Sequence, residues 1–357
     1  MTLRRVVLAG LLTVTALSLS QVAAGGATSV RTFASHLNNP RGLEVGPDGA
    51  LYIAEAGAAG TLKCIKGPEG KQCAGFTGAV IRATGSGQQV YASGFISGGA
   101  PDGSGSTGID DVAVSPGGTV YGIITSFGRN HNIAGPEGAK QLGNVLRIDR
   151  RAKTTIANVD SYEFTHNPAK DNVDSDPYGI AWAGDGLLVA DAAGNSLLHV
   201  GLSGNVSTVA TFRAQEIGGH FAQSVPTSVV VGPDGAYYVG ELGGGAPPGH
   251  ARIWRGYIGQ KPSVWKTGFS TITGLAFGPD GSLYVSELNP GGLGEVFNPK
   301  GNPHGALIRI WPDGHRTEIA HGQLVQPGGV AVGQDGTVYV SVFSILRNRG
   351  AVVAISQ

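Results

Sequence analysis

Short apolar runs separated by tight-turn residues recur along the chain, and the clearest copy occupies residues 226–242. There the run 229–231 meets a Gly-Pro-Asp-Gly turn, and a second run, 237–239, ends on Glu241. Pro sets φ for the first corner of a type I turn, Asp tolerates the second corner, and Gly takes the left-handed position. This pattern predicts a β-hairpin with a three-residue loop.

The same unit occurs six times, and its turns lie 46 to 69 residues apart. That spacing is close to the period of about 40–50 residues of propeller blades with insertions. The copies occupy residues 38–57, 108–127, 176–195, 226–242, 271–288 and 326–343. Each of the first five hairpins is followed by two weaker strand patterns, which makes four short antiparallel strands per unit. The sequence therefore predicts an all-β, six-bladed β-propeller.

The sixth unit is one strand short, because only residues 351–355 follow its hairpin. A matching strand pattern, residues 29–34, precedes the first hairpin just as residues 316–320 precede the sixth. Uncovered strand edges are a liability that ring-shaped sheets avoid. We therefore expect the N-terminal strand to join the C-terminal blade and close the ring.

The amino-acid composition supports this architecture and limits the classes of partner that the protein can bind. The chain has 357 residues, of which 60 are Gly, and about 7% Gly is usual in soluble proteins. Many tight turns between short strands account for the excess. Lys plus Arg equals Asp plus Glu, at 25 each, so no basic field is available to attract nucleic acid. We expect a monomer that forms one propeller domain over residues 25–357.

The first 24 residues read as a secretory signal peptide. Arg4 and Arg5 precede an apolar stretch, residues 6–19, and small residues follow up to Ala24. The stretch is shorter than the roughly 20 residues that span a bilayer. We expect cleavage after Ala24, a secreted or periplasmic protein, and no membrane insertion after cleavage. An uncleaved N-terminal anchor is the alternative.

Two cysteines, Cys64 and Cys73, are separated by eight residues. In an oxidising compartment such a pair predicts one local disulfide. The alternative is half of a metal site, which would need further Cys or His ligands nearby in the sequence, and none lie close.

Several motifs together resemble one known family. The stretch LLVADAAGNSLLHV is similar to an NHL-type propeller repeat. The combination of NPRGLEVGPDGALYIAEAG, the Cys64/Cys73 loop ending in GFTGAV, YEFTHNP with DSDPYGI, PTSVVVGPDGAYYVGEL and GHARIWR resembles the ScyD/ScyE family of secreted propeller proteins, named from scytonemin biosynthesis clusters. The resemblance covers essentially the whole mature chain. It implies a six-bladed, NHL-like propeller outside the cytoplasm and supplies no catalytic mechanism. The GGGAPPG stretch after Glu241 departs from the family, which tends to carry aromatic residues there.

Acids recur at one position, the end of the second strand of a unit. They are Glu55, Asp191, Glu241 and Glu287. Because equivalent blade positions form a ring, such carboxylates could hold Ca²⁺, which takes six to eight oxygen ligands. The alternative is local: each acid accepts backbone N–H groups in the turn that follows it.

A second set should line the central channel, because it lies at or next to the start of the innermost strands. It comprises Arg41, Asp110, Asp111, Asp176 and Tyr178. Arg41 with a neighbouring acid could orient a carboxylate or sugar ligand. The alternative is an ion pair that only satisfies the channel.

Two classes of function fit this sequence. The first is an extracytoplasmic binding or scaffold protein that holds a small molecule, glycan or protein at the loop-rich face and channel mouth. The second is a metal-dependent, lactonase-like hydrolase in which channel acids hold a divalent metal that activates water. We favour binding, since no catalytic motif of a recognised type is present.

Overall fold

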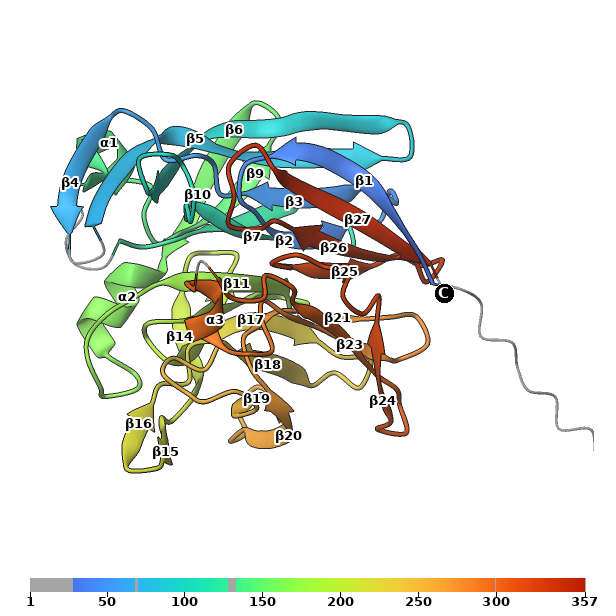
Figure 1. The fold of residues 1–357 in the computed structure, drawn as a ribbon. Helices are drawn as coiled ribbons and strands as arrows, with labels where there is room; N and C mark the ends of the chain where they lie inside the picture. The colour runs from blue at the N-terminus through green and yellow to red at the C-terminus, as the bar shows by residue number, and fades with distance from the viewer. Residues whose placement is uncertain (1–27, 68–69, 128–132, 299, 357) are drawn as a thin grey trace, which may run out of the picture.

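A computed structural model describes residues 28–67, 70–127, 133–298 and 300–356. The signal peptide predicted over residues 1–24 lies outside these ranges. The described residues form six antiparallel blades around a common axis, so the predicted six-bladed β-propeller is confirmed (Figure 1). No helix among them is long and apolar enough to cross a membrane.

The strands of each blade follow one another outward from the axis, except in the last blade. Blade one contains β2 (Pro40–Val45), β3 (Leu51–Glu55), β5 (Gly70–Thr84) and β6 (Gly87–Gly99), with β4 (Lys63–Gly67) added beside β5. Blade two contains β7 (Ile109–Val114), β8 (Val120–Ile124), β9 (Asn144–Asp149) and β10 (Ala152–Asn158). Blade three contains β11 (Pro177–Trp182), β12 (Gly186–Asp191), β13 (Ser196–Gly201) and β14 (Val206–Thr211).

The second half of the ring repeats this order. Blade four contains β17 (Pro226–Val231), β18 (Tyr237–Glu241), β19 (Ala251–Gly256) and β20 (Ser263–Phe269). Blade five contains β21 (Ile272–Phe277), β22 (Leu283–Glu287), β23 (Ala306–Ile310) and β24 (Arg316–Ile319). Blade six contains β25 (Val330–Val332), β26 (Val338–Val342), β27 (Gly350–Ser356) and β1 (Ser29–Leu37).

The ring closes as the sequence predicts. Strand β1, drawn in blue, runs antiparallel beside β27, drawn in red (Figure 1). Val30 pairs with Ile355 and Ala34 with Val352. The start of the described chain thereby covers the edge that the last hairpin would otherwise expose.

The Pro233-Asp234-Gly235 hairpin has the predicted turn. Gly235 adopts φ of 75°, and its N–H donates to Gly232 O at 2.9 Å. The Asp234 carboxylate accepts the N–H of Ala236 at 3.2 Å, and Val231 then pairs with Tyr237 across the hairpin. The turn residues therefore set the register that places the apolar side chains in the core.

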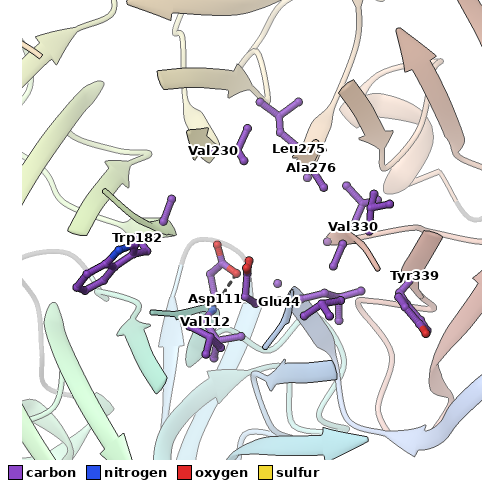
Figure 2. A pocket seen from close by; sticks show the side chains of 18 of the residues that line it. Glu44, Asp111, Val112, Trp182, Val230, Leu275, Ala276, Val330 and Tyr339 are labelled. Atoms are coloured by element: carbon purple, nitrogen blue, oxygen red, sulfur yellow. Dashed lines mark hydrogen bonds between the residues drawn. The ribbon is translucent and has the colours of Figure 1, made fainter. Parts of the chain in front are cut away.

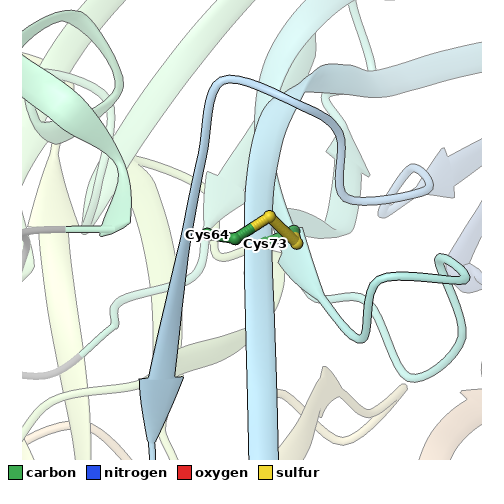
Figure 3. The surroundings of a disulfide bond; sticks show 2 residues. All are labelled: Cys64 and Cys73. Atoms are coloured by element: carbon green, nitrogen blue, oxygen red, sulfur yellow. A yellow bond between two sulfur atoms is a disulfide. The ribbon is translucent and has the colours of Figure 1, made fainter.

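The remaining elements lie in the longer connections, both within blades and between them. Helices α1 (Gly135–Ala139) and α3 (Leu293–Val296) lie in such connections, whereas α2 (Val159–His166) and the small hairpin β15 (Gln215–Ile217) and β16 (His220–Ala222) lie between blades. The predicted disulfide is confirmed: Cys64 in β4 is bonded to Cys73 in β5, with their Cα atoms 4.0 Å apart (Figure 3). It fastens one long connection back onto blade one.

Innermost strands of neighbouring blades approach each other closely, and glycine makes this approach possible. A Cβ added to Gly329 would lie 2.6 Å from the carbonyl oxygen of Arg41, and one added to Gly274 would lie 2.8 Å from the backbone nitrogen of Val330. Both distances are too short for any side chain. The equivalent position is Ser228 in blade four and Asp111 in blade two, and the charged side chain of Asp111 shapes the candidate site.

Candidate functional site

The innermost strands β2, β7, β11, β17, β21 and β25 surround a cavity of about 900 Å³ (Figure 2). Its lining runs from the short turns after these strands, such as residues 46–49 and 333–335, inward to a layer formed by Asp110, Tyr178, Thr227 and Thr273. In antiparallel blades these short turns lie at the opposite end from the long connections. The sequence predicts a ligand at the loop-rich face and channel mouth, and this cavity occupies the channel on the side of the short turns.

Glu44 is the exceptional side chain on the cavity wall. The equivalent positions of the other five blades carry only small apolar residues, Ala113, Ala181, Val230, Ala276 and Ala331. Glu44 is partly buried, and no hydrogen bond from the described residues reaches its carboxyl group. Burial, together with the charge of Asp111, raises the pKa of Glu44 to about 8.

Asp111 extends toward Glu44 from the neighbouring blade (Figure 2). Its carboxylate lies over Gly42, where a Cβ would be 1.7 Å from Asp111 Oδ1. The two oxygens accept the N–H of Val112 at 2.8 Å and of Ile180 at 3.0 Å. Asp111 therefore joins blade two to blade three. Burial raises its pKa to about 7, against the opposing effect of these two hydrogen bonds.

The inner end of the cavity brings together three of the residues predicted to line the channel. Arg41 donates from Nη2 to the carbonyl oxygen of Ser106 at 2.7 Å and from Nη1 to Tyr178 Oη at 3.4 Å. Its Nε lies 3.9 Å from Asp110 Oδ1 and makes no hydrogen bond. Asp110 Oδ2 is also buried without a hydrogen-bond partner. The ion pair therefore leaves polar atoms of both residues unsatisfied.

Of the predicted channel residues, Asp110, Asp111 and Tyr178 line the cavity, whereas Arg41 and Asp176 lie behind its wall. Asp176 accepts the hydroxyl of Thr125 at 2.6 Å. Burial raises the pKa of Asp110 to about 7, although Arg41 opposes the shift. Burial likewise raises the pKa of Asp176 to about 6.

The four acids that end second strands lie in four different blades, and each is bound within its own surroundings. Glu55 accepts Nδ2 of Asn38 at 2.9 Å, and Asp191 accepts the N–H of Gly194 at 3.0 Å. Glu241 accepts Nη2 of Arg252 at 2.7 Å, and Glu287 accepts the N–H of Ser270 at 2.5 Å. These contacts hold turns and connections in place, which is the local role stated above as the alternative to Ca²⁺ binding.

The structure does not bring these four acids together for Ca²⁺. In the part of the chain that the structure describes, no three His, Cys, Asp or Glu side chains are grouped so that they could hold a metal ion. Glu44 also lines the cavity, although it is not among the channel residues predicted from the sequence. The sequence does distinguish this residue, because alignment of the six repeats places Glu44 at a position where the other five repeats have Ala or Val.

Comparison with known proteins supports the fold. No protein-family model matches the chain, and no curated protein is similar to it. Virginiamycin B lyase from Staphylococcus aureus is 14% identical, with a TM-score of 0.52, and the match covers 92% of this chain and 99% of that one. A putative glucose dehydrogenase from Thermus thermophilus is 18% identical (TM-score 0.53; 92% and 100% covered). The soluble aldose sugar dehydrogenase of Escherichia coli is 14% identical (TM-score 0.55; 92% and 99% covered). At these identities the likeness shows that the chain shares the β-propeller scaffold of these proteins.

Proposed function

We propose that this chain is an extracytoplasmic β-propeller protein of the ScyD/ScyE type that binds a small organic molecule in its central channel. The cavity is the observation that carries this proposal. Its volume of about 900 Å³ falls in the range of about 300–1,000 Å³ typical of small-molecule sites. Apolar residues from all six blades form about half of its wall, and polar groups gather at the inner end and at the mouth, so the wall can contact an apolar body and fix the orientation of polar groups.

The location outside the cytoplasm and the family assignment in this proposal depend mainly on the sequence. The signal-peptide pattern of residues 1–24 and the Cys64–Cys73 disulfide both favour an oxidising compartment outside the cytoplasm. The repeat motifs and the cysteine loop support the family assignment. The hydrolase alternative requires a divalent metal held by several side chains, and no group of three suitable side chains exists among the described residues.

A blocking variant tests the channel as the binding site. Val230 lines the cavity, so Val230→Trp would project an indole ring into it and narrow the channel. Val264 is 41% exposed on the outermost strand of the same blade, which makes Val264→Trp a matched control. We expect a thermal-shift screen of small molecules to yield compounds that raise the melting temperature of the wild type and of Val264→Trp by about 3–6 °C at 100 times Kd.

These compounds should not stabilise Val230→Trp, although that variant should fold. Trp182 lines the cavity, so a bound compound should also change its fluorescence. If all compounds found by the screen stabilise Val230→Trp as much as the wild type, ligands bind elsewhere and the proposal is wrong.

A further inference from the structure

The channel has an excess of negative groups. Glu44, Asp110 and Asp111 line the cavity, and Asp176 lies close behind its wall. Among the residues that the structure describes, the one cation near them is Arg41, whose guanidinium already donates to Ser106 and Tyr178. Positions at the same depth in blades four and five are occupied by Thr227 and Thr273, which carry no charge.

The channel carboxyl groups also have unused capacity to accept hydrogen bonds. A carboxylate offers about four lone-pair sites. Glu44 accepts no hydrogen bond from the described residues, and Asp111 accepts two. Asp110 is fully buried, and its Oδ2 has no hydrogen-bond partner. Polar atoms of this kind are rarely left unsatisfied in a native protein unless a ligand or water completes them.

Building on the proposed binding function, we propose that the ligand of the channel is an organic ammonium cation whose nitrogen lies between Glu44 and Asp111. These two side chains point into the cavity from blades one and two (Figure 2). Val230 and Leu275 lie across the cavity on blades four and five, and Trp182 lies to one side. An ammonium group supplies donors to the two acids, while an apolar body attached to it contacts the opposite wall.

Other ligand chemistries fit this arrangement less well. An anion would be repelled by Glu44, Asp110 and Asp111, and the guanidinium of Arg41 already donates to other groups. A sugar would leave the carboxylate charges uncompensated, because hydroxyl groups are neutral. Calcium needs six to eight oxygen ligands, and no three acids among the described residues are grouped for a metal.

Binding of a cation between these two acids should be linked to the release of protons, which can be measured. Burial raises the pKa of Glu44 to about 8 and that of Asp111 to about 7. An adjacent cation favours the ionised carboxylates and lowers both pKa values. Binding should therefore release protons, and affinity should rise from pH 6 to pH 8. The other charged or titratable groups around this pair lie in three places: Asp110 and Tyr178 at the inner end, Arg41 and Asp176 behind the wall there, and Asp48, Asp335 and Tyr339 toward the mouth.

The test is calorimetric titration of the purified mature chain with three probes of one shape and different charge. These probes are phenethylamine, 2-phenylethanol and 3-phenylpropanoate. We expect phenethylamine to bind at least tenfold more tightly than the neutral and anionic probes. Glu44→Gln should weaken phenethylamine about 10- to 100-fold and leave 2-phenylethanol within twofold. Asp185→Asn is the control, since Asp185 is exposed on the same face outside the cavity.

Several results would overturn the inference. They are equal affinity for the alcohol and the amine, an amine affinity unchanged in Glu44→Gln, and no phenethylamine binding at its solubility limit. Tight binding of Ca²⁺ alone that Glu44→Gln abolishes would also overturn it, since the pair would then be a metal site. The channel-binding function survives each of these outcomes if Val230→Trp still blocks other compounds, so the two proposals fail separately.

Discussion

Removing the charge of Glu44 should stabilise the protein, and the gain should depend on pH. Glu44→Gln keeps the size of the side chain and removes its ionisation. In the folded chain the pKa of Glu44 is raised to about 8, mainly by burial, from an ordinary value of 4.5. Ionisation therefore favours the unfolded chain. The penalty is absent below pH 4.5, grows as the pH rises to about 8, and is constant above that pH.

The interval from 4.5 to about 8 sets the size of this effect. At about 1.4 kcal/mol per pH unit, the penalty reaches roughly 3 kcal/mol at pH 7 and roughly 5 kcal/mol at pH 9. Glu44 is only partly buried and faces a cavity that admits water. Since effective dielectric constants near 20 describe even buried sites best, we expect about half of these values. Glu44→Gln should thus raise the free energy of unfolding by about 1.5–2.5 kcal/mol between pH 7 and pH 9.

Urea denaturation followed by circular dichroism measures this difference at intervals from pH 4 to pH 9. Subtraction of the wild-type value at each pH cancels the titration of the groups that do not interact with Glu44. The difference should vanish near pH 4, and Glu216→Gln, which removes an exposed carboxylate on β15, should stay within about 0.5 kcal/mol at every pH. A difference that does not change with pH, or a variant less stable than the wild type at pH 8, would refute the reasoning, since Glu44 would then have a stabilising partner.

Three further changes test other parts of the molecule. Replacing both Cys64 and Cys73 by Ser should lower the free energy of unfolding by about 2–3 kcal/mol in the chain-entropy model; reductant should shift the urea curve of the wild type to that of the variant and leave the curve of the variant unchanged. Glu241→Ala leaves the buried guanidinium of Arg252 without its carboxylate partner, so we expect a loss of about 3–5 kcal/mol in urea denaturation, and a loss under 1 kcal/mol would contradict this role. Both carboxylate oxygens of Glu163 are buried without hydrogen-bond partners, and burial raises its pKa to about 7. Glu163→Gln should therefore stabilise by up to about 3 kcal/mol at pH 8 and not at pH 4.5, and a destabilised variant at pH 8 would show that the carboxylate is needed.

The architecture was predictable because its determinants are local and repeated. A turn such as Pro233-Asp234-Gly235 sets hairpin register within a few residues, and the missing strand of the sixth unit had one evident source in residues 29–34. The meeting of Arg41, Asp110 and Tyr178 also followed from repeat position alone, because equivalent positions of a ring face the same axis.

The end at which the cavity lies could not be predicted in the same way. It depends on how side chains and connections fill each mouth of the channel, which involves contacts between residues distant in sequence. The long connections suggested the loop-rich face by their length. The cavity instead lies where the innermost strands carry small residues, such as Ala181 and Ala276.

Equivalent positions of the six blades differ in a way that points to a functional role for Glu44 and Asp111. At both positions the other blades show residues that are compatible with a stable fold. The five other blades have Ala or Val in place of Glu44, and four blades have Gly in place of Asp111. Burial acts against both carboxylates, as their raised pKa values show. Sequences keep residues that oppose folding mainly where function requires them. Two such residues on neighbouring blades, facing one cavity, are therefore better explained by a ligand than by the fold.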